Sequence, residues 1–388
     1  MGTGIKMVLT REKLIRECYG DLMPETHCLV SSYNDQFYDS GRKGLVSSSS
    51  RGLKENLSIS PLVEANLSPI GLDLIVGDVY RSDCLRLLDN ISELFDMEMI
   101  MPDKNGKILL EPNLDGKNIY YIASQEEIFL PSKFSLMVDA KSSSGRVALM
   151  CTDQSRNILR RFSTAWPLVV AAQPYSFPLL IHPGKTKLFQ TAIRLKNSGF
   201  MGPEEVVASE EIGLFDKQTQ LSKEEFATEH GLRMTYHTDF ALRAKLLSQI
   251  PEPIDMDVIG KYNVLDFYDY IEGNGKIKMD SKRFYLMGTR ETIRQGSVCG
   301  NLSRETKETG TGLWGHFAGI IQPGFRGPIT MECRSESPRI IREGDEAGFV
   351  RLDNLEVPLD NLVSGYGGFY QNQKVPMAPK MFKELALK

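Results

Sequence analysis

Glu332 is the carboxylate whose surroundings in the sequence most suggest chemistry. It lies in an apolar run after Pro323-Gly324, a pair that suits the centre of a tight turn because Pro presets φ and Gly accepts a positive φ. The runs around the pair predict a β-hairpin, and strand alternation places Glu332 on the face opposite Met331 and Cys333. A carboxylate held there can act as a general acid or base, and it can equally be solvated or half of an ion pair.

A second candidate is the polar segment from Lys141 to Arg146, which lies between two apolar runs. It contains three serines, a glycine and two flanking cations. Hydroxyls, inward-turned backbone amides and cations together bind anions such as phosphate through charge-assisted hydrogen bonds. The segment is therefore a candidate anion-binding corner, with a Ser-rich polar turn as the alternative.

The composition is that of an ordinary globular chain, and it limits the possible partners. A length of 388 residues suggests two or three domains, each large enough to bury a core. Charged residues make up 25% and the net charge is −4, so no overall basic field favours nucleic acid or an anionic membrane. No apolar run has the length of a membrane span, and the N-terminus lacks the apolar centre of a secretory signal. We expect a cytoplasmic protein with no nucleic-acid or membrane partner.

Cysteine and histidine are dispersed along the chain. None of the six cysteines forms a Cys-x-x-Cys pair, and none of the five histidines lies in a His-x-Glu motif. Buried reduced thiols fit this spacing better than a disulfide or zinc framework. We therefore expect no zinc and no metal bound directly by the protein.

The first two thirds of the chain divide into three regions with different patterns of apolar, polar and turn residues. Residues 1–56 are expected to hold a short amphipathic helix, Arg11–Cys18, and a polar linker. Residues 57–200 carry short apolar runs separated by turn residues, which predicts a β-sandwich or barrel with one helical interlude at Ser82–Phe95. Residues 201–245 are acidic, contain helix-start signals and are expected to form a helical connector.

Short, strand-like apolar runs return over residues 246–363, and their pattern matches that of the first half. The run Phe284–Ile293 aligns with Ile119–Ile128 without a gap, with Tyr, Glu and Ile at corresponding places. This agreement predicts a diverged tandem repeat of one β-domain. The final stretch, 364–388, begins with glycines, aromatics and amides, which fit either a closing lid or a frayed terminus.

Three of these features, in this order, resemble the dCTP deaminase and dUTPase superfamily. Lys141–Arg146 resembles its phosphate-binding Ser-Ser loop, Ala318–Gly327 followed by Glu332 resembles its hairpin, and Tyr370–Gln373 resembles the lid of the deaminases. The chain is most similar to the double-length dCTP deaminase branch. The resemblance implies a mainly β protein with two tandem dUTPase-like distorted β-barrel or jelly-roll domains, short helices in the N-terminal region and connector, and sites between neighbouring domains. It also implies a homo-oligomer, for which a trimer is one arrangement.

The resemblance further implies hydrolytic deamination of dCTP to dUTP and ammonia. Glu332 would shuttle protons, since release of ammonia from C4 of cytosine needs an activated water and a proton for the base. Ser142 would orient the water or the base edge, and Mg²⁺ bound through the substrate triphosphate would offset part of its charge. The residues implied in substrate binding are Lys141, Ser143, Arg146, Gln322, Tyr370, Gln371 and Gln373.

Two departures from the family pattern bear on this assignment. Gln322 stands where the family has Asp, and Gln cannot act as the base that activates water in dUTP hydrolysis. Pro167–Ala172 of the first repeat has no Glu where the second has Glu332, and Arg304–Glu308 of the second replaces the Ser-Ser loop. This complementary loss predicts one composite site, within one chain or between chains. A dUTP pyrophosphatase, a bifunctional enzyme and a catalytically inactive nucleotide-binding protein are the alternatives.

Overall fold

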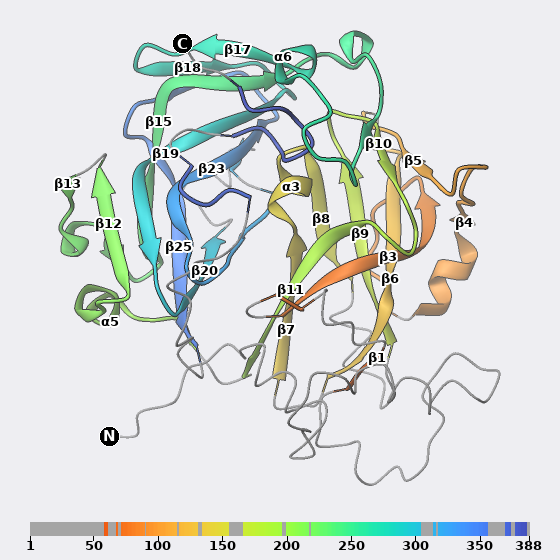
Figure 1. The fold of residues 1–388 in the computed structure, drawn as a ribbon, viewed down its shortest axis with the longest axis horizontal. Coiled ribbons are helices and arrows are strands. Elements are labelled where there is room, and N and C mark those ends of the chain that lie inside the picture. Colours follow the sequence, from red (N-terminus) through yellow and green to blue (C-terminus); the bar gives the residue numbers. More distant parts are fainter. Residues whose placement is uncertain are drawn as a thin grey trace, which may run out of the picture.

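The computed structural model describes residues 58–60, 67–68, 71–89, 91–114, 116–130, 134–154, 166–195, 199–216, 219–303, 313–315, 317–355, 369–373 and 377–385. Two groups of strands lie side by side and make up most of this part of the chain (Figure 1). The expected helix Arg11–Cys18 and the rest of the N-terminal region up to residue 56 lie outside the described residues. None of the described helices is long and apolar enough to cross a membrane.

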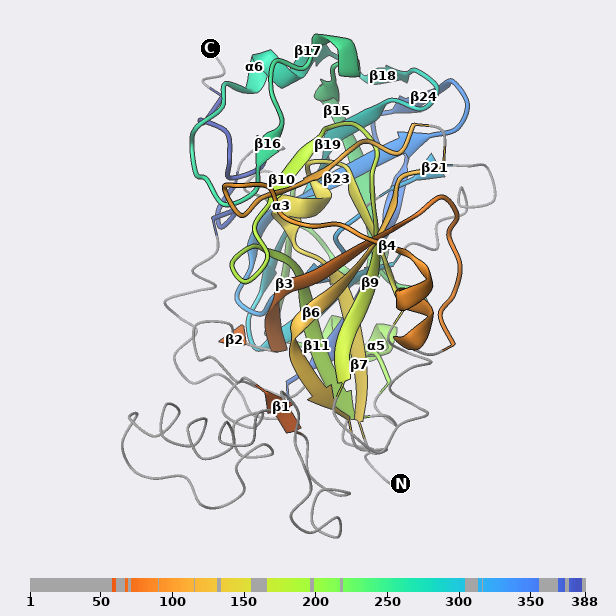
Figure 2. The same cartoon turned by 90° about the vertical axis from the view of Figure 1, so that its right-hand side faces the viewer.

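The first sheet runs in the order β7, β11, β3, β6, β9, β8, and its neighbouring strands are antiparallel. Figure 2 shows β3, β6 and β9 of this sheet side by side. Their bounds are β3 Gly71–Ser82, β6 Ile119–Phe129, β7 Phe134–Ala140, β8 Leu149–Asp153, β9 Trp166–Pro174 and β11 Lys187–Leu195. The short strands β1 Ser58–Ser60, β2 Leu67–Ser68 and β4 Glu98–Met99 pair with β6 or β3.

The second sheet is centred on β25, β15 and β19. Its longer strands are β12 Ile212–Asp216, β15 Gly231–Ala244, β19 Phe284–Gln295, β20 Val298–Ser303, β23 Arg326–Ser335 and β25 Glu346–Asn354. Its shorter ones are β13 Thr219–Gln220, β14 Ala227–Thr228, β17 Tyr268–Glu272, β21 Leu313–Trp314 and β22 Ile320–Ile321.

Small sheets and short helices complete the described structure. One small sheet joins β5 Ile108–Leu110, β10 Leu179–Ile181 and β16 Ile254–Asp255, and another joins β18 Lys276–Met279 and β24 Arg339–Arg342. The α-helices are α3 Ser142–Gly145, α5 Pro203–Ala208 and α6 Val264–Phe267, and the 3₁₀ helices are η2 Ile91–Asp96, η3 Lys223–Glu225 and η4 Leu247–Gln249. The protein is therefore mainly β with few short helices, as the sequence predicted.

Both sheets contain the same strand topology. The order β7, β11, β3, β6, β9 in the first corresponds to β20, β25, β15, β19, β23 in the second. Each set follows the same sequence of pairings, and all of these pairs are antiparallel. The tandem repeat predicted from Ile119–Ile128 and Phe284–Ile293 is thus confirmed, because these runs form the corresponding strands β6 and β19.

The side chains that fix the bulge in these two strands also correspond. Ser124 and Thr289 each donate a hydroxyl hydrogen bond to the carbonyl two residues onward and accept one from an N–H of the next strand. The carboxylates of Glu126 and Glu291 accept N–H donors from β3 and β15. The register shifts at this point in both sheets. The polar agreement between the aligned runs therefore has a structural cause.

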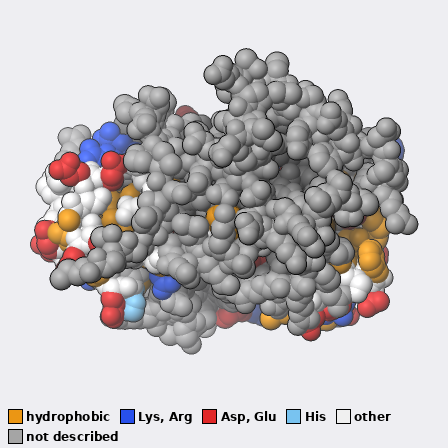
Figure 3. Space-filling model, turned by 90° about the horizontal axis from the view of Figure 1, so that it is seen from below, with side chains coloured by type: hydrophobic (Ala, Val, Ile, Leu, Met, Phe, Trp, Pro, Cys, Tyr) orange, Lys and Arg blue, Asp and Glu red, His pale blue; other side chains and the backbone are white. Residues whose placement is uncertain are grey.

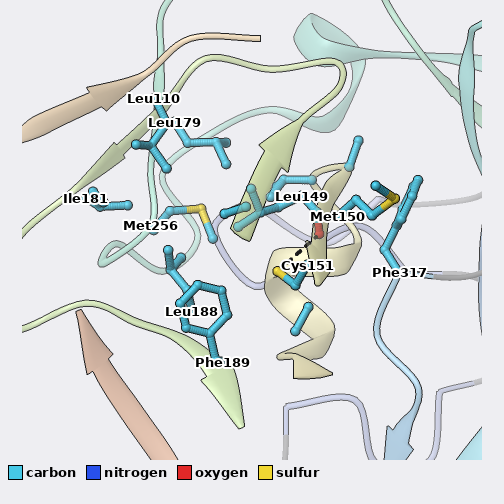
Figure 4. Close-up of a cluster of buried hydrophobic side chains, with 14 of the residues drawn as sticks. Leu110, Leu149, Met150, Cys151, Leu179, Ile181, Leu188, Phe189, Met256 and Phe317 are labelled. Atoms are coloured by element: carbon cyan, nitrogen blue, oxygen red, sulfur yellow. Dashed lines mark hydrogen bonds between the residues drawn. The ribbon is translucent and has the colours of Figure 1, made fainter. Parts of the chain in front are cut away.

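The halves share part of their hydrophobic core. The largest cluster combines side chains of the first half, such as Phe177 and Phe189, with Phe284 and Phe317 of the second, all almost fully buried. Figure 4 shows Phe317 beside Met150 in this cluster. Burial of large apolar side chains from both halves holds the halves against each other. This packing fixes the position of α3, which lies between the halves in Figure 1.

The expectation of a helical connector over residues 201–245 is mostly wrong. Helices occur there only at α5 and η3, whereas β12 and the long β15 are strands of the second sheet. In β15, alternate residues such as Leu232, Met234 and Tyr236 are buried, so the pattern has the period of a strand. The expected helix Ser82–Phe95 is likewise wrong. Among the described residues of this segment, helical structure begins only at Ile91, in η2.

The predicted hairpin around Pro323-Gly324 is a turn without a paired hairpin. Gly324 has a φ of 80°, and the N–H of Phe325 donates to the carbonyl of Gln322 at 3.3 Å, as a tight turn requires. The flanking strands do not pair with each other, because β22 pairs with β20 and β23 pairs with β19. The turn therefore connects two different neighbours within the sheet.

The described surface carries charges of both signs. At the left edge of Figure 3, Lys and Arg side chains lie beside Asp and Glu side chains. This mixture accords with the small net charge of −4.

Candidate active site

Glu332 lies in β23, where strand alternation turns it away from the hydrophobic core of the second half. Its neighbours Met331 and Cys333 are fully buried in that core, as predicted, while Glu332 lines a cavity between the two halves. Its side chain is only 2% exposed. The N–H groups of Phe317 and Ala318 both donate to its Oε2, each at 2.8 Å. The carboxyl group is therefore desolvated and held by backbone donors on one oxygen.

This setting changes the acidity of Glu332. Burial raises its pKa to about 7, because the charged form loses its hydration. The positive charge of Arg146 and the two backbone N–H donors act in the opposite direction, and the carboxylate of Asp139 raises the pKa further. A carboxyl group with a pKa near 7 can both accept and deliver a proton near neutral pH.

The opposite wall of the cavity comes from α3 of the first half. Ser142 begins this single helical turn and Arg146 follows it, and both line the cavity. Gly145 lies against the carboxylate: a Cβ at this position would be 2.5 Å from Glu332 Oε2 and 2.8 Å from the Cβ of Ala318. Only glycine allows this close approach. The structure thus brings the predicted loop and the predicted acid together within one chain.

Arg146 is covered by the C-terminal segment. Its guanidinium carbon lies 3.7 Å from the centre of the Tyr370 ring, and its Nη2 donates to Gln373 Oε1 at 3.2 Å. Its Nη1 donates to the carbonyl of Met377 at 2.8 Å. The Tyr370 hydroxyl is 2.8 Å from Ser143 Oγ. The described part of the expected lid is therefore seated on the predicted anion-binding segment.

Six of the nine predicted site residues line the cavity: Ser142, Arg146, Gln322, Glu332, Tyr370 and Gln373. The other three, Lys141, Ser143 and Gln371, do not. The ammonium group of Lys141 pairs with Asp73, and Gln371 holds the tail on the turn by donating to the carbonyl of Gly324 at 2.8 Å. These three residues support the segments that form the walls.

Two buried residues join the walls, and neither was a predicted site residue. Asp139 Oδ2 accepts the N–H of Gly319 at 2.8 Å. Gln190 donates to the carbonyls of Ala140 and Ile320, and its Oε1 accepts from Gln322, each at 3.3 Å. Neither residue lies in a motif, and their partners in the second half are 130 to 180 residues away. Local sequence patterns carry no signal for such contacts.

The first repeat has an alanine at the position of Glu332. Glu332 pairs with Leu286 across β23 and β19, and Ala171 pairs with Tyr121 across β9 and β6. Leu286 and Tyr121 correspond in the repeat alignment. Ala171 is fully buried. The carboxylate is therefore missing from the first repeat, while Arg304–Glu308 of the second lies outside the described residues.

One cluster of potential metal ligands occurs among the described residues, and it does not line this cavity. The ligand atoms of His182, Asp255 and Asp257 lie within 4.8 Å of one another. Lys107 donates to Asp255 at 2.7 Å, and Thr186 donates to Asp257 at 2.7 Å. These carboxylates thus already have cationic or hydroxyl partners, and the cluster forms a polar network.

Fold and site together define a two-domain, dUTPase-like β protein with a buried carboxylate in a cavity between its repeats. The chain belongs to the dCTP deaminase-like family. The model of the dCTP deaminase-like domain matches residues 48–192, and that of the C-terminal domain of 2'-deoxycytidine 5'-triphosphate deaminase matches residues 214–382. These matches fit the double-length branch.

A solved structure has the same fold. The crystal structure of 2'-deoxycytidine 5'-triphosphate deaminase from Agrobacterium tumefaciens superposes with a TM-score of 0.67 at 18% sequence identity. The alignment covers 92% of this chain and 99% of that one. No curated protein matches the chain in sequence.

Proposed function

We propose that this protein deaminates dCTP hydrolytically to dUTP and ammonia, with Glu332 as general acid and base and without zinc. The observation that carries the proposal is the position of Glu332. Its carboxyl group is buried, has a pKa of about 7 and shares one cavity with Ser142 and Arg146 of the other repeat. Membership of the dCTP deaminase-like family supports the choice of substrate.

Glu332 has the properties that each proton transfer in this reaction needs. Its carboxylate takes a proton from a water molecule, whose oxygen adds to C4 of cytosine, and then delivers that proton to N3. The remaining proton of that water, now on the C4 hydroxyl, moves to the exocyclic amino group. The C4–N bond then breaks, ammonia leaves, and the C4 carbonyl of uracil forms. Ser142 lines the same cavity and orients the water or the base edge.

The triphosphate binds, in this proposal, at the anion-binding segment around α3. Arg146 supplies the cation that lines the cavity, and Mg²⁺ accompanies the substrate and offsets part of its charge. The cavity measures about 40 Å³, far below the roughly 300 Å³ at which ligand pockets begin. Residues 369–373 therefore have to move off Arg146 before dCTP can enter, and they can close over it afterward.

The proposal is tested by incubating the purified protein with dCTP and Mg²⁺ and separating the products. We expect dUTP and ammonia in equal amounts. Formation of dUMP and pyrophosphate would indicate a bifunctional enzyme, which the amide of Gln322 argues against. Binding of dCTP without turnover would indicate an inactive nucleotide-binding protein and overturn the proposal.

The absence of zinc from the mechanism needs a separate measurement. Activity should survive a zinc-specific chelator and respond to Mg²⁺ through the triphosphate. Stoichiometric zinc in the active protein, lost together with activity on chelation, would contradict this part of the proposal.

A further inference from the structure

Three consecutive backbone N–H groups are divided between two buried carboxylates. Those of Phe317 and Ala318 donate to Glu332 Oε2, each at 2.8 Å. The next, of Gly319, donates to Asp139 Oδ2, also at 2.8 Å. Asp139 therefore fixes the end of the same amide run that orients the proposed general base.

Asp139 belongs to the other repeat from the amides it holds. It lies near the end of β7, 180 residues from Gly319 and three before Ser142. Its Oδ1 accepts the N–H of Ala140 at 2.8 Å, and its side chain is 7% exposed. A single buried carboxylate thus connects the segment that leads into α3 with the Phe317–Gly319 segment, whose N–H groups bind Glu332.

We propose that Asp139 is a positioning residue of this site, which holds the Phe317–Gly319 amide run so that two of its N–H groups fix Glu332 against α3. This inference rests on the proposed role of Glu332. It adds a residue from the first repeat whose carboxylate acts through the backbone of the second and does not line the cavity.

The charges around Glu332 make the role of Asp139 measurable. The titratable and charged groups around Glu332 are Arg146 after α3, Asp139 of β7, Tyr268 of β17, Tyr370 of the tail and Cys333 of β23 itself. Burial has the largest effect on the pKa of Glu332, Arg146 lowers that pKa, and the negative charge of Asp139 raises it. Loss of the Asp139 charge alone should lower the pKa of Glu332. Loosening of the Phe317 and Ala318 N–H donors should raise that pKa, and each donor has a larger effect than the Asp139 charge.

The test replaces Asp139 with Asn and measures dCTP turnover against pH. The asparagine amide would have only one acceptor oxygen for two N–H donors, so the amide run should loosen. We expect kcat to fall roughly tenfold with KM for dCTP changed by less than about twofold. The pH at which kcat is half-maximal should move up, because the weakened N–H donors outweigh the lost negative charge. The control is Glu126→Gln, which removes another buried carboxylate that accepts a backbone N–H of β3.

Two outcomes would overturn the inference. If Asp139→Asn and Glu126→Gln lower kcat equally and leave the pH profile unmoved, Asp139 has only a structural role. A ¹³C NMR titration of the Glu332 carboxyl group, without dCTP, gives the second readout. If Asp139→Asn leaves that titration unchanged or lowers it, the inference fails, even if the wild-type protein turns over dCTP, because loss of the charge alone lowers it.

The same titration separates this inference from the proposed function. A raised Glu332 titration in the Asp139→Asn variant of a protein that does not deaminate dCTP would support the positioning by Asp139 and reject the reaction. Asp139→Ser is measured alongside, because it removes the charge with a smaller side chain and keeps the test available if the Asp139→Asn variant does not fold.

Discussion

Gly145 of the first repeat packs directly on the carboxylate of Glu332 of the second. A Cβ added at position 145 would be 2.5 Å from Glu332 Oε2 and 2.7 Å from Oε1. The contact joins two residues that are almost 190 positions apart in the sequence and brings the backbone of α3 to the proposed acid. The two repeats can approach this closely at the site because Gly145 has no side chain.

Gly145→Ala should damage this contact. The added methyl group must displace either α3 or the Glu332 side chain, and such overpacking typically costs about 1–3 kcal/mol of stability. We expect a lower unfolding temperature and at least a tenfold loss of kcat. Gly202→Ala is the control, since its Cβ would meet no atom closer than 3.9 Å. Normal kcat in Gly145→Ala would show that Glu332 does not need its observed position.

Glu332→Gln tests the proposed chemistry most directly. Gln keeps the size of the side chain, and its carbonyl oxygen can still accept the N–H groups of Phe317 and Ala318. It cannot take or deliver a proton, so kcat should fall by roughly 10² to 10⁴ while dCTP still binds. The control is Glu291→Gln, a buried carboxylate of the same repeat that holds Thr235 and does not line the cavity. Turnover within a few fold of the wild type would reject Glu332 as the base.

The local parts of this architecture could be predicted from the sequence, and the long-range parts could not. Alternation around Glu332 is a local pattern, so it correctly separated the cavity face from the core face. Shared polar residues revealed the repeat because they fix the same bulge in β6 and β19. Strand partners and the contact from Asp139 to Gly319 depend on how distant segments pack, and the alternation within β15 was obscured by the acidic, helix-favouring residues before it.

The pKa of Glu332 also predicts how stability depends on pH. Its folded pKa of about 7 lies above the ordinary value of 4.5, so the folded state binds the proton more tightly than the unfolded state. The contribution of Glu332 to stability is full below about pH 4.5 and is lost as pH rises through about 7. The loss is on the order of 3 kcal/mol.

Glu332→Gln should remove this pH dependence. The variant and the wild-type protein should have similar free energies of unfolding near pH 4.5, and the variant should be the more stable of the two at pH 8. Urea titrations at both pH values measure the difference. A difference that does not change with pH would show that the folded pKa of Glu332 is close to its ordinary value.

The composite site predicts how two variants with different defects behave when they are mixed. Arg146→Ala removes a cation that lines the cavity and should weaken dCTP binding by roughly ten- to a hundredfold, because a charge-assisted contact contributes about 1.5–3 kcal/mol. Arg290→Ala, at an exposed arginine paired with Asp216, is the matched control and should bind dCTP normally. Isothermal titration with dCTP and Mg²⁺ measures both.

Because Arg146 and Glu332 meet within one chain, each chain of a mixture carries its own defect at its own site. Mixing Arg146→Ala with Glu332→Gln, including a cycle of unfolding and refolding together, should therefore restore no activity. A protein with sites formed between chains would instead recover part of the wild-type kcat, since some mixed assemblies would hold one intact pair. Recovery of activity in the mixture would show that the working site joins the loop of one chain to the Glu332 of another.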